Sequence, residues 1–199
     1  MLVGDNWTHK DYIDIFMSFI EFLITNSRNG NLNFQHISDL FATMVTEQTT
    51  DYEAKRFFTF LTKENEGSQS RERRFLLDER QRVNVFQKIM CNQETLDCAK
   101  LQTEGFNCFK MLFLNVNAEQ RNINFDVQTG VFNVVDLKQF QNLLGLNTLW
   151  SIAIQNRVPA VCKMSRDFLV DIFLRTQVDP KHKKLHTESF MLRIEQISN

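Results

Sequence analysis

Apolar residues recur along this chain at three- and four-residue intervals, the spacing that lines one face of an α-helix. The clearest example is the stretch 147–175, in which two helical patterns are separated only by Pro159. A third apolar run follows Pro180. Helices joined by short polar segments are typical of an α-solenoid, a fold that presents surface. We therefore expect an all-α fold, an α-solenoid-like stack of helical hairpins of the armadillo or HEAT type.

The same periodicity predicts helices along most of the chain. Thr8 and Asp11 form a variant of the capping box at the start of the first helix, and Asn29-Gly30 ends it. The polar stretch 64–70 is predicted to be a mobile loop. The further expected helices cover residues 33–46, 50–63, 70–91, 103–116, 137–144, 147–155, 158–175 and 187–197.

One region has the pattern of strands rather than of a helix. Two short apolar runs within residues 122–136 flank a turn at Gln128-Thr129-Gly130. Because an isolated hairpin is only marginally stable, we expect residues 117–136 to form a surface insertion with a small strand-like part.

The composition agrees with long helices that pack through dry seams. The chain has 199 residues, with 19 Phe against 2 Tyr and 2 Trp, and only 6 Gly and 2 Pro remain for turns. Phe has no polar group to satisfy, so its excess favours large apolar contacts between helices. We expect one helical-repeat segment over residues 1–199. The chain ends within a helical pattern that lacks a stop signal, which predicts a segment of a longer protein.

The charge balance excludes several classes of partner. A net charge of -1 argues against nucleic-acid binding and against acidic membranes, since both need a basic surplus. The basic runs Arg71–Arg74 and Lys181–Lys184 are interpreted as solvated helix ends or loops. Neither a membrane-spanning run of ~20 apolar residues nor a signal peptide is visible in the sequence. We expect the protein in the cytoplasm, with the nucleus as a second compartment.

Motifs for chemistry are absent from the sequence. We find no nucleotide-binding loop and no nucleophile motif. His182 and His186 have the spacing of two ligands on one helix face, but a third ligand is missing nearby, so neither a metal nor another cofactor is expected. Four cysteines have separations that fit neither a zinc site nor a disulfide framework, and they are interpreted as structural thiols: Cys91, Cys98, Cys108 and Cys162.

Several motifs follow one another in a distinctive order. Residues 105–113 have the form G-x-N-x-F-x-x-x-F, and residues 145–153 read GLNTLWSIA. A Leu-His pair followed by Phe occupies Leu185–Phe190, and an aromatic-rich helix pattern at 33–63 lies upstream. In this order the motifs resemble the helical N-terminal arm of the very large ubiquitin-specific proteases of the fat-facets type. The resemblance covers most of the chain and is loose at 64–93 and 118–135.

The resemblance implies a deubiquitinase parent, a thiol protease of the ubiquitin conjugation pathway, and a segment that is not itself catalytic. The family places its nucleophile in an N-T-C motif and its histidine in a G-H-Y motif, and this sequence contains neither. The resemblance further implies armadillo-like repeats that recruit or orient partners. Expected partners are proteins, among them ubiquitinated substrates, and the neighbouring repeats of the parent chain.

Two hypotheses of function remain at this point. The first is a protein-interaction scaffold, for which Trp7 and Tyr12 are the candidate partner-binding residues, whereas Trp150 is expected in the core. The alternative is a helical regulatory module or a cysteine-dependent enzyme. In that case Cys91 or Cys98 would be a reactive thiol. Its general base would be His9, His36 or a C-terminal histidine.

Overall fold

The computed structural model describes residues 8–26, 32–46, 50–65, 74–75, 77–126 and 128–198. Helices account for 70% and strands for 6% of this structure. This helical content is about twice the ~35% that is typical of globular domains, which confirms the prediction of a mostly helical chain. The chain divides into two compact units, Met1–Val85 and Phe86–Asn199.

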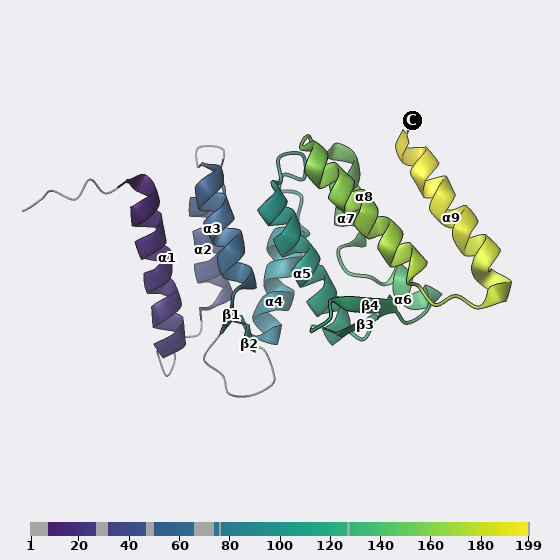
Figure 1. Cartoon of the computed structure of the whole chain (residues 1–199), viewed down its shortest axis with the longest axis horizontal. Coiled ribbons are helices and arrows are strands. Elements are labelled where there is room, and N and C mark those ends of the chain that lie inside the picture. The colour runs from purple at the N-terminus through teal and green to yellow at the C-terminus, as the bar shows by residue number, and fades with distance from the viewer. Residues whose placement is uncertain are drawn as a thin grey trace, which may run out of the picture. The chain divides into compact units, whose positions relative to one another are not determined.

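The first unit is built around helix α3, which packs against both α1 and α2, while α2 also packs against α4 (Figure 1). Helices α2 and α3 begin close to the predicted positions, and local capping interactions set their starts. The Asn33 side chain accepts a hydrogen bond from the His36 amide, and Thr50 and Glu53 form a capping box. The elements are α1 (His9–Asn26), α2 (Phe34–Met44), α3 (Asp51–Thr62), β1 (Glu64–Asn65), β2 (Arg74–Phe75) and α4 (Glu79–Val85).

Phenylalanine rings fill the interior of this unit. Phe41 of α2 and Phe57 of α3 meet edge to face, with 5.6 Å between ring centroids, and Phe60 is completely buried. Such pairs stabilise a core beyond the burial of their area. The predicted Phe-rich seams between helices are confirmed here.

The prediction of one long helix over residues 70–91 is wrong for its first part. Arg74–Phe75 pairs antiparallel with Glu64–Asn65, within the predicted loop, and α4 begins only at Glu79. The start is set by a reciprocal pair: Gln81 N–H donates to the Asp78 carboxylate, and Asp78 N–H donates to the Gln81 side chain. The remaining loop residues 66–70, the basic residues 71–73 and the Asn29-Gly30 stop lie outside the described residues.

The second unit contains the π-helical turn η1 and five α-helices, among which α7 and α8 pack most closely (Figure 1). A continuous row of rings runs through its core, including Phe86–Phe109 at 5.4 Å and Phe113–Phe168 at 5.5 Å between centroids. The elements are η1 (Phe86–Met90), α5 (Thr103–Glu119), β3 (Ile123–Asp126), β4 (Val131–Val134), α6 (Leu137–Gln141), α7 (Leu146–Gln155), α8 (Pro159–Leu174) and α9 (Pro180–Ser198).

The predicted hairpin is present, but it is not a surface insertion. Strands β3 and β4 pair antiparallel with Ile123 opposite Val134, and residues 128–130 form the turn. Ile123, Phe132 and Val134 are buried, so one face of the hairpin belongs to the core. The Val134 backbone also bonds to the segment after α8, because its N–H donates to the Arg175 carbonyl at 3.1 Å. This packing against α5 and α8 supplies the stability that an isolated hairpin lacks.

Helix α9 begins at Pro180, seven residues before the predicted start. Proline is favoured in the first helical turn, and the Asp179 side chain accepts a hydrogen bond from the Lys181 amide at 2.9 Å. The basic run therefore lies in the first turns of α9, where Lys181, Lys183 and Lys184 are exposed. This is the solvated helix end that the sequence predicted.

Two buried asparagines join segments that are distant in sequence. The Asn117 amide donates to the carbonyls of Phe113 and Leu144, and its oxygen accepts from the Leu144 N–H at 2.9 Å and from Asn122. Asn156 donates to the carbonyls of Cys98 and Leu101 at 2.7 and 2.9 Å. Each amide thereby satisfies backbone groups that would otherwise be buried without partners.

No helix in the described part of the chain is long and apolar enough to cross a membrane.

We expect Asn117→Ala to lower the free energy of unfolding by about 2–4 kcal/mol, because both backbone polar groups of Leu144 lose their partner. Urea unfolding of the full chain measures this. Asn133→Ala, at an exposed position of β4, is the matched control and should change stability by less than about 0.5 kcal/mol. Equal stability of the two variants would show that the Asn117 amide does not hold the loop.

Candidate interaction surfaces

Helix α1 is joined to α3 and to the residue after it by polar side-chain pairs. Asp14 accepts a hydrogen bond from the Tyr52 hydroxyl at 2.5 Å and pairs with Arg56 at 2.7 Å. Glu21 pairs with Lys63 at 2.5 Å. Met17 is the fully buried apolar residue of this helix. Ile13, Ile20 and Ile24, on the same side of the helix as Met17, are half-buried, so α1 carries apolar residues on two sides.

The opposite side of α1 is an exposed apolar face, which we call the α1 face. Its members recur at three- and four-residue intervals and are between 43% and 61% exposed. Scattered exposed apolar residues are normal, but a contiguous stripe of large ones marks an interaction surface. The α1 face consists of Tyr12, Ile15, Phe16, Phe19, Phe22 and Leu23.

One of the two partner-binding residues proposed from the sequence lies on the α1 face. Tyr12 lies at its N-terminal end and is 61% exposed, whereas Trp7 lies outside the described residues. Phe16, Phe19 and Leu23, whose helical spacing is visible in the sequence, lie on this exposed face. On the side of α1 that meets α3, Asp14 and Glu21 pair with Tyr52 and Arg56 of α3 and with Lys63, which follows α3.

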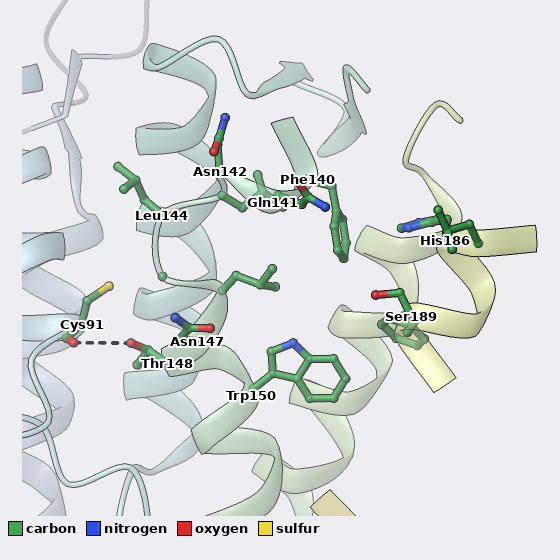
Figure 2. A pocket seen from close by; sticks show the side chains of 15 residues that line it. Cys91, Phe140, Gln141, Asn142, Leu144, Asn147, Thr148, Trp150, His186 and Ser189 are labelled. Atoms are coloured by element: carbon green, nitrogen blue, oxygen red, sulfur yellow. Dashed lines mark hydrogen bonds between the residues drawn. The ribbon is translucent and has the colours of Figure 1, made fainter. Parts of the chain in front are cut away.

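The second surface is a groove of 870 Å³ in the unit Phe86–Asn199 (Figure 2). It lies between the loop and helices at 140–150 and one side of α9. None of the fifteen described residues that line it is Asp, Glu, Lys or Arg. In a chain with 24% charged residues, this lining favours uncharged ligands.

The loop wall of the groove is fixed by Asn117 and by Gly145. Gly145 has a φ of +81°, a conformation that favours glycine. A Cβ atom there would lie 2.5 Å from the ring of Phe86. The loop can therefore pass close to η1 only because this residue has no side chain.

Trp150 lies in the core, as the sequence predicted, and it also lines the groove. It is 7% exposed, and its ring lies 5.5 Å from that of Phe190 on α9. Phe190 in turn stacks on Phe173 of α8 at 4.3 Å. These rings attach α9 to the rest of the unit.

His186 is a buried imidazole at the α9 side of the groove. Phe173 stacks on its ring at 4.5 Å, and Phe140 meets it nearly perpendicularly at 5.0 Å. Burial lowers the pKa of His186, and a hydrogen bond to the Phe173 backbone opposes this only partly. Its Nε2 atom is buried and has no hydrogen-bond partner among the described residues.

The environments of the cysteines disfavour an activated thiol. Burial raises the pKa of Cys91 to about 12, and it also raises the pKa values of Cys98 and Cys108. A nucleophilic cysteine needs the opposite shift. Figure 2 shows Cys91 at one end of the groove and His186 at the other, so this histidine cannot act as its base. Within the described residues, no cluster of three or more potential ligands is placed to bind a metal.

Comparison with known proteins does not assign the chain to a family. No family model matches its sequence, and no curated protein matches it.

We expect Cys91, Cys98 and Cys108 to react with a chromogenic disulfide at least about a hundredfold more slowly than free cysteine near neutral pH, because little thiolate forms. A Cys162→Ser background removes the fourth, partly exposed thiol. Labelling of the chain unfolded in concentrated guanidinium is the control, because all of its thiols are then accessible to the reagent. Rapid labelling of one native cysteine would instead support the reactive-thiol alternative.

We also expect a pH dependence that arises from His186. In the unfolded chain the His186 imidazole takes up a proton near pH 6.5. In the folded chain it does so only at lower pH, because its pKa is lowered. The free energy of unfolding should therefore fall as the pH drops through 6.5 toward the folded pKa. Urea unfolding at several pH values measures the effect, and His186→Phe should show a smaller loss over the same range. Identical pH profiles would exclude His186 as the source.

Proposed function

We propose that this chain is a non-catalytic protein-interaction scaffold, a segment of a large deubiquitinase of the fat-facets type that helps to recruit or orient substrates or partners. The α1 face is the observation that carries the interaction role. Its large apolar side chains are costly to leave in water, and a protein partner that covers them gains their transfer free energy. The resemblance in motif order supports the choice of parent protein.

The same proposal accounts for the helical architecture. Stacked helical hairpins of the armadillo or HEAT type would present such faces to neighbouring repeats or to a partner. Ubiquitinated proteins are the substrates that this parent would engage, and the cytoplasm is its compartment, with the nucleus as a second one. The raised pKa values of Cys91, Cys98 and Cys108 favour this scaffold role over the cysteine-dependent alternative.

The α1 face can be tested by placing a charge at its centre. Phe19 is 56% exposed, so Phe19→Asp should leave the melting temperature nearly unchanged. Binding to partners captured with the full chain should fall at least about tenfold, because a carboxylate would be buried in an apolar contact. Quantitative mass spectrometry of the captured proteins measures the loss.

Ser18→Asp is the matched control, since Ser18 is also exposed on α1 but outside the apolar stripe. It introduces the same charge one residue away and should retain binding. Partners that bind wild type, Ser18→Asp and Phe19→Asp equally would contradict the role of the α1 face. Ubiquitin chains and ubiquitinated proteins among the partners lost by Phe19→Asp would support the deubiquitinase assignment.

A further inference from the structure

The groove in the unit Phe86–Asn199 is lined by polar side chains without hydrogen-bond partners among the described residues, and by no Asp, Glu, Lys or Arg. The side-chain amides of Gln141 and Asn142 and the Ser189 hydroxyl make no hydrogen bond to any described residue. Figure 2 shows the side chains of Asn142 and Ser189 at the loop side and the α9 side of this groove. Trp150 and Phe190 also line the groove and provide apolar surface. These are the features of a site that orients a mostly apolar ligand by a few polar contacts.

A second observation points to a ligand at the same place. His186 is 5% exposed and lines the groove, and Figure 2 shows its ring directed from α9 toward Phe140. Its Nε2 has no hydrogen-bond partner among the described residues. Burying a polar atom in this way costs free energy. A donor on a bound ligand would remove that cost.

We propose that this groove binds an uncharged segment of a partner protein. Its apolar side chain contacts Trp150 and Phe190, and its backbone amides pair with Gln141, Asn142 and Ser189. A peptide fits because it offers both N–H donors and C=O acceptors, which the amides, the hydroxyl and the imidazole can match. A charged segment is disfavoured because it would lose its hydration without meeting an opposite charge.

The volume favours a segment over a single side chain. At 870 Å³ the groove lies within the range of about 300–1,000 Å³ that is typical of ligand sites. The site is independent of the α1 face, since the two surfaces belong to different units. A failure of peptide binding in the groove would therefore leave the proposal for the α1 face untouched, and the reverse also holds.

The test uses the immobilised full chain and three pools of octapeptides with blocked termini. One pool contains only Ala, Ser, Asn, Gln, Leu, Phe and Tyr, and in the two others Glu or Lys replaces Ser. We expect the neutral pool to be retained at least about tenfold better than either charged pool. Preferred retention of a charged pool, equal retention of all three, or no retention of the neutral pool would overturn the proposal.

The retained neutral peptides are then titrated into the ¹⁵N-labelled chain. We expect the Trp150 indole N–H signal and the amides of residues 141–147 to shift. Ser189→Asp, at an exposed groove position, should weaken binding at least about tenfold, whereas Thr187→Asp, two residues away and outside the lining, should not. Phe19→Asp should also leave this binding intact. A peptide that binds both aspartate variants of α9 equally would locate its site elsewhere.

Discussion

The hydrogen bonds between the Asn117 side chain and the Leu144 backbone determine much of the second unit. They attach the end of α5 to the loop before α7, across 27 residues of sequence. The loop position in turn sets where α7 begins, and thus where Trp150 meets Phe190 of α9. Asn156 fixes the other end of α7 in the same manner. The Asn117 amide, together with Gly145, thus sets the loop wall of the groove.

The two units expose apolar surface for different physical reasons. In α1, acidic side chains pair with Arg56 of α3 and with Lys63, which follows α3, and the phenylalanines are left outside. In the groove, a glycine in a left-handed conformation and the buried Asn117 amide keep a loop in place beside α9. The first surface is a convex helix face that suits a broad partner, and the second is concave and suits a short segment. We regard them as two separate binding surfaces.

Local signals in the sequence predicted most helices and the hairpin turn. The Thr8–Asp11 pair and the apolar period of 103–116 are examples, since their partners lie within a few residues. The inward side of α1 could not be predicted, because periodicity identifies an apolar stripe but not the charges that α3 presents to it. Asn117 was missed for a similar reason, as its partner Leu144 is distant in sequence. Tyr12, the candidate binding residue named from the sequence, lies on an exposed face whose extent only the structure reveals.

The polar attachment of α1 also has a dynamic consequence. Its ion pairs with α3 are partly solvent-exposed, and such pairs contribute little to stability and weaken as salt is added. With Met17 as its fully buried apolar residue, we expect α1 to open locally before the whole unit unfolds. A partner that covers its phenylalanines would suppress this opening. Recognition and the local order of α1 would then be thermodynamically coupled, so that binding itself completes the folding of the helix.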